Sequence, residues 1–245
     1  MGNQLPTLIQ SETNDRFKLW KSLLTSKGIK KEGTAILSGK KLIQEYLLKY
    51  SNQIVAELRL EKQPAVSLAP QFILSANIFS ELDELGTHFN LLVIKTPELP
   101  KWKDDLKSGM VLFLPLGDPS NLGAAIRSAH SFQVDQIVLL QESANTYLPK
   151  TIKSSAGSVF SAPLYIGPTL SQLPMEVIAL DQSGKSLPDF QWPKLSYLVV
   201  GEEGPGLKGL QIQKKVTIPI ENVESLNATV ATSIALYDWK IKNKK

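Results

Sequence analysis

The sequence predicts an α/β protein with two parts: a small N-terminal α/β domain and a C-terminal domain built on a parallel sheet. Short apolar runs alternate with segments of helical periodicity along the 245 residues. This alternation is typical of parallel strands that helices cover on both faces. A stretch with Pro97, Pro100 and a run of charge interrupts the pattern, so we interpret residues 96–109 as a linker. The flanking parts, residues 1–95 and 110–245, have the size of modest domains.

Each part contains its own set of expected elements. The first should have strands over residues 34–38, 53–60, 71–74 and 90–94, and helices over residues 11–27, 39–50 and 76–85. Phe17, Trp20 and Leu24 share one face of its first helix, as an amphipathic helix requires. The second should have strands over residues 110–116, 136–140, 177–180, 197–200 and 215–218, and helices over residues 121–132, 148–155 and 225–242.

Composition narrows the class of protein and of partner. The chain has no cysteine, which excludes disulfides, thiolate catalysis and cysteine-ligated metals, and we expect no metal site. It has neither a run of about 18 apolar residues nor a secretory signal pattern, so we expect a cytoplasmic protein without a membrane partner. The first 50 residues carry nine basic and four acidic side chains, a local net charge of +5. This excess fits a polyanionic partner such as RNA or DNA, or a solubilising surface.

Three short blocks in the second half follow predicted strands. Such junctions lie at the carboxyl ends of strands, where open α/β folds bind ligands. In the first block, residues 118–127, Ser120 or Asn121 can cap the next helix. Gly123 permits close backbone approach, and Arg127 lies one to two turns into the helix. The alternative interpretation is a capped helix whose arginine pairs with some carboxylate.

The second block, residues 201–206, reads Gly-Glu-Glu-Gly-Pro-Gly. Residues 204–209 match the G-x-G-x-x-G fingerprint of dinucleotide sites, but three features argue against that function. Pro205 removes a backbone donor that a pyrophosphate would need, Glu202 and Glu203 add negative charge, and one strand and one helix remain downstream. A glycine-rich loop with adjacent carboxylates better suits a neutral or cationic ligand, or it is a plain tight turn.

The third block begins with Ile218, Pro219 and Ile220, which end the last strand. Ser225 is a good N-cap for the terminal helix, and Asn227 would lie in its first turn. Helix capping alone would explain these residues, although capping and a functional role are compatible.

Together the three blocks resemble the motifs of the SpoU/TrmH family of the SPOUT superfamily of RNA methyltransferases. The family patterns Asn-x-Gly-x-x-x-Arg, Gly-x-Glu-x-x-Gly and Ile-Pro followed by Ser-Leu-Asn are matched in order by Asn121, Gly123 and Arg127, by Gly201, Glu203 and Gly206, and by Ile218, Pro219, Ser225, Leu226 and Asn227. The resemblance covers about residues 110–240. Residues 15–95 more loosely resemble a substrate-binding domain related to a ribosomal-protein fold.

The chain departs from the family pattern at several positions. Gln133 stands where glycine is usual, Ile220 replaces methionine, Ala228-Thr229 replaces Val-Ser, and Ser38-Gly39 stands where Glu-Gly is common. None of these changes removes a proposed catalytic group, although the Ser38 change weakens any assignment of substrate contacts in the N-terminal domain.

The resemblance implies a fold, a reaction and partners. The implied catalytic domain contains a deep trefoil knot and transfers a methyl group from S-adenosylmethionine to a ribose 2′-hydroxyl in RNA and not in DNA. The substrate it implies is rRNA or tRNA, of which rRNA is favoured. It also implies a homodimer through the C-terminal helix, where Leu226, Val230, Ile234 and Tyr237 form an apolar stripe. The residues implied for catalysis are Arg127, Asn121, Glu203, Ser225 and Asn227, and those for the cofactor are Gly201, Gly206, Ile218 and Leu226.

The role of Arg127 stays open between two alternatives. The family arginine is proposed as a base, but a guanidinium has a pKa above 12 and is normally a pure donor. The other alternative is that Arg127 grips a phosphate and stabilises the developing alkoxide. Two further functions remain as rivals: a non-catalytic RNA-binding protein that keeps this fold, and a nicotinamide-dependent dehydrogenase built on residues 204–209.

Overall fold

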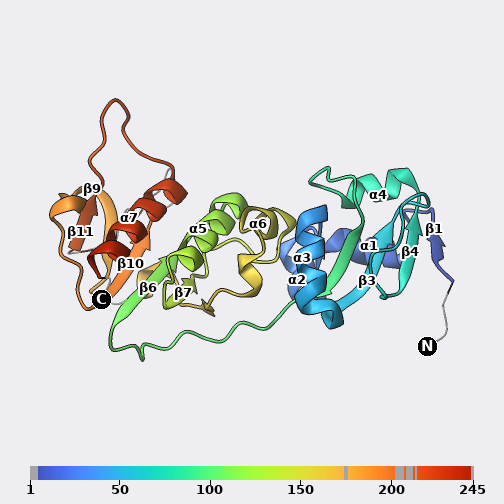
Figure 1. Ribbon diagram of the computed structural model, residues 1–245, viewed down its shortest axis with the longest axis horizontal. Coiled ribbons are helices and arrows are strands. Elements are labelled where there is room, and N and C mark those ends of the chain that lie inside the picture. The colour runs from blue at the N-terminus through green and yellow to red at the C-terminus, as the bar shows by residue number, and fades with distance from the viewer. Residues whose placement is uncertain (1–4, 174–175, 202–206, 208–211, 213, 244–245) are drawn as a thin grey trace. The chain divides into compact units, whose positions relative to one another are not determined.

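The chain divides into two compact units in a computed structural model that describes residues 5–173, 176–201, 207, 212 and 214–243 (Figure 1). Unit 1 comprises Met1–Glu98 with Asn145–Gly157, and unit 2 comprises Leu99–Ala144 with Ser158–Lys245. Nothing in the sequence pattern predicted that residues 145–157 belong to unit 1. No helix of the described ranges is long and apolar enough to cross a membrane.

Unit 1 is built on a mixed five-stranded sheet with the order β1-β4-β3-β5-β2. Its strands are β1 (Thr7–Ile9), β2 (Thr34–Leu37), β3 (Ile54–Arg59), β4 (Gln71–Leu74) and β5 (Leu91–Lys95), and its helices are α1 (Asp15–Ser22), α2 (Ser26–Glu32), α3 (Lys40–Tyr50), α4 (Ala76–Leu82) and α6 (Pro149–Ser154). β4 runs parallel to both β1 and β3, whereas β5 is antiparallel to its two neighbours. The prediction that the N-terminal part has an α/β fold is therefore confirmed.

The single helix expected over residues 11–27 is wrong, because α1 ends at Ser22 and a second helix, α2, begins at Ser26 and continues to Glu32. The Asn14 side chain caps α1 by accepting from the Arg16 backbone nitrogen at 2.9 Å. Thr25 caps α2 by accepting from the nitrogen of Gly28 at 3.1 Å. Each cap takes extended backbone angles, which start a new helix. The buried face of α1 contains Phe17 and Trp20 as expected.

Glu57 on β3 is fully buried and organises the loop that follows. Its carboxylate accepts from the backbone nitrogens of Val66 and Ser67, both at 2.8 Å, and from the Gln71 amide at 3.0 Å. The Asn90 amide also donates to the Glu57 carboxylate. Burial alone would raise the pKa of Glu57, but the hydrogen bonds from Gln71, Ser67, Val66 and Asn90 outweigh burial and hold the pKa below its usual value. Two residues along β3, Arg59 donates to the carbonyl of Gln63 at 2.8 Å.

Glu57→Gln is expected to lower the free energy of unfolding by about 2–4 kcal/mol. The glutamine amide would place its own N–H donor against N–H donors from which the Glu57 carboxylate accepts, so these groups would lose their hydrogen bonds. Urea unfolding measures this loss, and Glu61→Gln in the same loop, an exposed site, should change it by less than about 0.5 kcal/mol. The stabilisation by Glu57 is fully present above its ordinary pKa of 4.5. It is lost as the pH falls through the lower pKa of the folded state. Equal effects of the two substitutions would contradict this role.

Unit 2 is built on a six-stranded sheet with the order β11-β9-β10-β6-β7-β8. Its elements are β6 (Gly109–Leu114), α5 (Pro119–Ser131), β7 (Gln136–Leu139), β8 (Leu164–Ile166), β9 (Ile178–Ser186), β10 (Leu195–Val200), β11 (Lys214–Thr217) and α7 (Ala228–Lys242). Every strand pair is parallel, which confirms the predicted parallel sheet. All six strands therefore present their carboxyl ends at one edge, the edge where such sheets bind ligands.

Residues 99–108, part of the segment expected to be a linker, pack on unit 2. The backbone of Lys101 pairs in parallel with Ile166, the last residue of β8. The Trp102 indole donates to the Gln136 side chain at 2.8 Å, and the Tyr197 hydroxyl donates to Asp104 at 2.6 Å. These contacts cover the sheet next to Tyr197 of β10.

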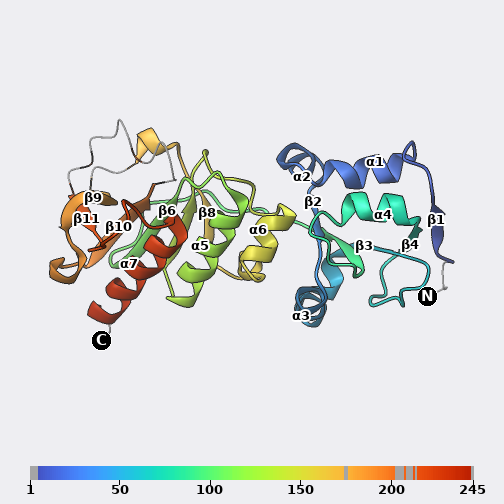
Figure 2. The same cartoon turned by 90° about the horizontal axis from the view of Figure 1, so that it is seen from above.

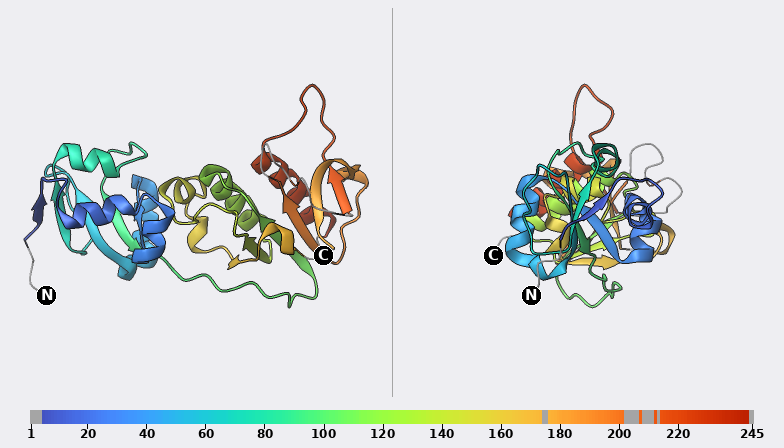
Figure 3. Two further views of the ribbon diagram at one scale, coloured as in Figure 1. Left: turned by 180° about the vertical axis from the view of Figure 1, so that it is seen from behind. Right: turned by 90° about the vertical axis from the view of Figure 1, so that its right-hand side faces the viewer.

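α7 is held at its C-terminal end by Lys242. The ammonium of Lys242 donates to the carbonyls of Leu187 at 2.8 Å, Pro188 at 2.9 Å and Phe190 at 3.1 Å. It also pairs with Asp238 one turn earlier at 3.0 Å. The other end of α7 follows residues 218–227, which form an arch standing away from the sheet (Figure 3).

Candidate functional site

Helices α5 and α7 lie side by side on unit 2 (Figure 2), and their N-terminal ends bring two predicted site residues together. The Asn227 amide nitrogen donates to the Asn121 amide oxygen at 3.1 Å, across 106 residues of sequence. The first and third blocks therefore meet directly.

The N-cap of α5 is Asp118, so the expectation of Ser120 or Asn121 is wrong. The Asp118 carboxylate accepts from the backbone nitrogen of Asn121 at 2.8 Å, and Pro119 occupies the first helical position. Proline fits that position because its missing N–H would have no helical partner. The side chain of Asn121 is thereby left to contact α7.

The N-cap of α7 is Asn227, so the expectation of Ser225 is also wrong. The Asn227 amide oxygen accepts from the nitrogens of Thr229 at 3.0 Å and Val230 at 3.4 Å. Because its amide nitrogen donates to Asn121, this single side chain both caps α7 and joins it to α5. Ser225 is exposed and lies two residues before the helix.

Thr229 completes the orientation of Asn121 and was not predicted. Its hydroxyl lies 3.3 Å from both the backbone and the side-chain oxygen of Asn121 and donates to them. With Asn227 and Thr229 donating to its amide oxygen, the amide nitrogen of Asn121 points away from both. That nitrogen makes no hydrogen bond within the described part of the chain, so it is a donor available to a ligand.

Arg127 lies on α5 with its side chain exposed. In the ranges that the structure covers, its guanidinium forms no hydrogen bond or ion pair, so those ranges contain no carboxylate partner for it. The contacts that join Asn121 to Asn227 do not reach Arg127 or Ser225. Arg127 is consequently free to contact an external anion.

α5 and α7 are joined further along by one contact between hydroxyls and one between aromatic rings. The hydroxyls of Ser128 and Ser233 lie 2.8 Å apart, and the rings of Phe132 and Tyr237 meet edge on with centroids 6.1 Å apart. Ser128 follows Asn121 by seven residues, a spacing that returns to the same face of a helix. That spacing could have predicted from the sequence that Ser128 lies on the same face of the helix as Asn121.

Gln133 ends α5 in the left-handed region, with φ of 58°. Its side-chain oxygen accepts from the Lys240 ammonium at 2.8 Å. Gln133→Gly is expected to raise the free energy of unfolding by about 0.5–1 kcal/mol, because glycine adopts this conformation without strain. Gln133→Ala keeps the strain and loses the Lys240 contact, so it should not be stabilising. Thermal unfolding of both variants tests this, and a stabilising alanine would contradict the explanation.

Of the residues expected to hold the cofactor, three lie in the described part. Gly201 follows β10, Ile218 follows β11 and Leu226 precedes α7, and all three are half-buried. Glu203 and Gly206 lie outside the described residues, as does most of the rejected G-x-G-x-x-G segment.

The segment that follows the apolar start of β9 also belongs to this edge and was missed. The Gln182 amide donates to the backbone carbonyl of Glu224 in the arch. Asp181 accepts from the Ser183 hydroxyl at 2.6 Å and from Lys215 at 3.3 Å. The hydrogen bonds from Ser183 lower the pKa of Asp181, and the nearby Lys215 lowers it further. A polar run directly after an apolar strand was the available signal, and it is the signal that identified the three blocks.

Residues 109–237 match the family described as SpoU rRNA Methylase family. The chain is 36% identical over 241 residues to "Ribosomal RNA small subunit methyltransferase G 2" of Syntrophobacter fumaroxidans, covering 94% of this chain but 48% of that protein. The chain therefore spans about half the length of this relative.

Two further similarities extend over almost the whole chain. The 23S rRNA (guanosine(2553)-2'-O)-methyltransferase RlmP of Bacillus subtilis is 27% identical over 245 residues, with 94% of this chain and 97% of that protein covered. The crystal structure of the SpoU methyltransferase AviRb from Streptomyces viridochromogenes in complex with the cofactor AdoMet superimposes with a TM-score of 0.75 at 23% identity. It covers 94% of this chain and 98% of that one, which establishes the shared fold.

Proposed function

The chain belongs to the SpoU rRNA methylase family, and we propose that it transfers a methyl group from S-adenosylmethionine to a ribose 2′-hydroxyl of ribosomal RNA. The observation that carries this proposal is the pairing of Asn121 with Asn227 at the edge of the parallel sheet where its strands have their carboxyl ends. The relative from Bacillus subtilis, which aligns over 94% of this chain, is a 23S rRNA 2'-O-methyltransferase. This relative favours rRNA over tRNA, and an RNA substrate would place the reaction in the cytoplasm.

The residues at the edge suit S-adenosylmethionine. Ile218 and Leu226 offer half-buried apolar side chains beside backbone groups, and the nearby cation Lys215 is paired with Asp181, so it does not oppose a sulfonium. The cofactor, when bound, supplies an electrophilic methyl group. Gly201, Gly206, Ile218 and Leu226 are the residues proposed to hold it, within loops proposed to form the family's trefoil knot.

Each catalytic residue has a role in handling the 2′-hydroxyl. Asn121, oriented by Asn227 and Thr229, donates its amide nitrogen toward the ribose. Arg127 contacts the adjacent phosphate and stabilises the negative charge that develops on the oxygen, because a permanently protonated guanidinium donates hydrogen bonds and does not accept a proton. Ser225 and Glu203 are proposed to lie around the same substrate. Deoxyribose lacks the reacting hydroxyl, so DNA is not a substrate.

The test is transfer of radiolabelled methyl groups from S-adenosylmethionine to unmodified rRNA and tRNA transcripts, followed by digestion to nucleosides. Label in a 2′-O-methyl nucleoside from rRNA is expected. Label found only in tRNA would mean that tRNA, not rRNA, is the substrate. Cofactor binding without transfer to any transcript would favour a non-catalytic RNA-binding protein. Quenching of protein fluorescence by NADH without S-adenosylmethionine binding would favour the dehydrogenase alternative.

We also propose that α7 forms a homodimer interface. Val230, Tyr237 and Ile241 expose 47%, 56% and 48% of their surfaces, whereas the opposite face of α7 is buried within unit 2. Of the predicted stripe, Val230 and Tyr237 are exposed, whereas Leu226 and Ile234 are half-buried. A second copy would cover the exposed members together with Ile241.

Tyr237→Glu is expected to convert the dimer to a monomer, because it places a charge in a buried apolar interface. Sedimentation velocity at several concentrations measures the change. Leu48→Glu, at an 87% exposed site on α3, should leave the dimer intact. A wild-type chain that sediments as a monomer at all concentrations would rule out the interface.

A further inference from the structure

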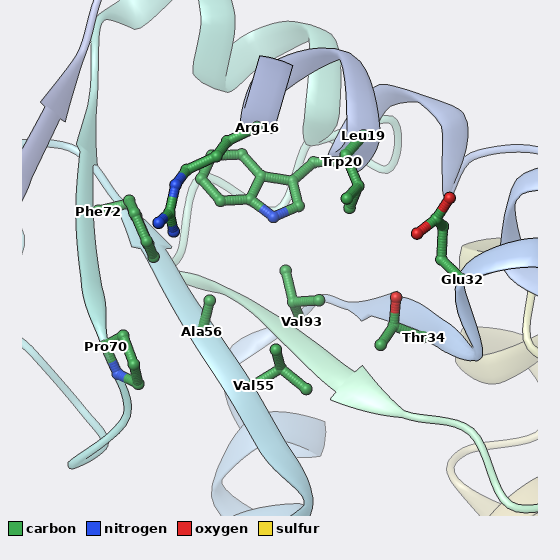
Figure 4. A pocket seen from close by; sticks show the side chains of 10 residues that line it. All are labelled: Arg16, Leu19, Trp20, Glu32, Thr34, Val55, Ala56, Pro70, Phe72 and Val93. Carbon is green, nitrogen blue, oxygen red and sulfur yellow. The ribbon is translucent and has the colours of Figure 1, made fainter. Parts of the chain in front are cut away.

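A pocket of about 330 Å³ lies between α1 and the sheet of unit 1 (Figure 4). Ala56 of β3 and Val93 of β5 form its floor, and Trp20 and Phe72 form an aromatic wall. The volume is at the lower end of the range of about 300–1,000 Å³ for ligand sites, so it suits a single heterocyclic ring. No residue of the Asn121–Asn227 site lines this pocket.

Apolar side chains remain uncovered at the pocket mouth. Leu19 of α1 and Val55 of β3 expose 38% and 39% of their surfaces, whereas Ala56 and Val93 beneath them are buried. A flat apolar group bound here would shield the exposed side chains of Leu19 and Val55 from water, which favours binding.

Polar groups of opposite charge stand at the two sides of the pocket. On one side the Arg16 guanidinium lies 4.7 Å from the Phe72 ring centroid, and Trp20 packs edge on against that ring at 5.0 Å. Glu32 and Thr34 lie on the other side (Figure 4). Arginine planes and aromatic rings are the surfaces on which unpaired RNA bases stack. A carboxylate accepts from an exocyclic amino group such as that of cytosine.

The surroundings of the pocket are basic. α1 and α2, which supply Arg16 and Glu32, also carry Lys18, Lys21, Lys27, Lys30 and Lys31. Lys18 and Lys21 pair with Asp15 and Glu81, and Lys31 pairs with Glu32 itself at 3.0 Å, which leaves the second carboxylate oxygen of Glu32 to accept from a ligand. Lys27 and Lys30 are exposed and form no ion pair with any residue that the structure describes. Exposed lysines on the helix that supplies Glu32 offer positive charge to the phosphates of a bound nucleotide. An apolar peptide side chain would make no use of this charge.

We propose that this pocket is a base-binding subsite for single-stranded RNA. It takes one unpaired base that carries an amino group, which Arg16 covers and Glu32 holds by accepting from the amino group. Uracil is disfavoured because its carbonyl oxygen would face the Glu32 carboxylate. The subsite rests on the proposed function and deepens it, since it requires the RNA substrate to contain an unpaired nucleotide.

The test compares binding of fluorescein-labelled oligocytidine and oligouridine to the full chain by fluorescence anisotropy, at one fixed salt concentration. Oligocytidine should bind more tightly than oligouridine. Val55→Trp, which fills the pocket mouth, should weaken oligocytidine binding by about tenfold or more. Leu48→Trp, at an exposed position on α3 that does not line the pocket, should leave binding unchanged.

A second variant keeps the test informative if Val55→Trp folds poorly. Glu32→Gln should reduce the preference for oligocytidine over oligouridine, because glutamine both donates and accepts. The exposed Glu12→Gln has the same change of charge and should keep the preference. An unchanged preference in Glu32→Gln, or equal binding by Val55→Trp and Leu48→Trp, overturns the proposal. Cytidine monophosphate that competes as strongly as oligocytidine also overturns it, since the site would then serve a free nucleotide.

Methyl transfer assayed on the same preparations separates this proposal from the proposed function. Transfer to rRNA with no effect of Val55→Trp on oligonucleotide binding would refute the subsite alone. The expected binding pattern without any methyl transfer would support the subsite and refute the methyltransferase activity alone.

Discussion

Arg127→Ala is expected to lower the rate of methyl transfer by about 100-fold or more while the affinity for S-adenosylmethionine stays nearly unchanged. The loss of one donor that stabilises developing charge commonly costs roughly 3–4 kcal/mol of transition-state stabilisation. The exposed guanidinium of Arg127 makes no hydrogen bond or ion pair among the residues that the structure describes, so the substitution should not unfold the protein. Single-turnover methyl transfer and calorimetric cofactor binding measure the two quantities separately.

Arg127→Lys is the matched variant. Lysine keeps the positive charge but lacks the planar fork that contacts a phosphate at two points, so a rate between those of the wild type and Arg127→Ala is expected. A large loss of cofactor affinity in Arg127→Ala would contradict the assigned role. A rate that rises with the deprotonation of this side chain would support the alternative of a base.

Asn227→Asp is expected to reduce methyl transfer by about 10–100-fold, equivalent to about 1.4–2.7 kcal/mol, with little change in stability. Aspartate caps a helix as well as asparagine does, so α7 should remain formed. Its carboxylate, however, would replace the amide nitrogen that donates to Asn121 at 3.1 Å. Asn121 would then turn its own nitrogen toward α7 and withdraw the donor assigned to the substrate.

Asn227→Ala provides the comparison because it removes both interactions. It should lose a similar amount of activity and also about 1 kcal/mol of stability through the missing cap. Thermal unfolding beside the methyl-transfer rate distinguishes the two variants. If Asn227→Asp kept full activity, the orientation of Asn121 by Asn227 would not matter for the reaction.

The sequence was informative where a pattern repeats over many residues. The strands β6, β7, β10 and β11 of unit 2 and the helix after Pro119 were located to within a few residues because periodicity and turn chemistry are local signals. Only the apolar start of β9 was predicted, because the rest of this strand is polar. The strands β1 and β8 were missed because each has three residues, too few to show a period. The excursion of residues 145–157 into unit 1 depends on tertiary contacts that no local pattern encodes.

The candidate site was predictable by residue type but not by geometry. The motifs identified Asn121 and Asn227, yet capping preferences favoured Ser120 or Asn121 and Ser225 as the caps. Several residues near each helix start have suitable side chains, and tertiary contacts decide among them. Thr229 was noted in the sequence only as a departure from the family pattern, because its role depends on α5, more than 100 residues earlier.

The unequal anchoring of α7 has a consequence for heat inactivation. Lys242 fixes the last turn to three carbonyls, whereas the first turn follows the exposed arch and is held by Asn227 and Thr229. Fraying should therefore start at the end of α7 that also orients Asn121, and such local opening takes less free energy than global unfolding. On warming, catalysis should cease several degrees before the fold melts, with early hydrogen exchange at the amides of Val230 and Ala231.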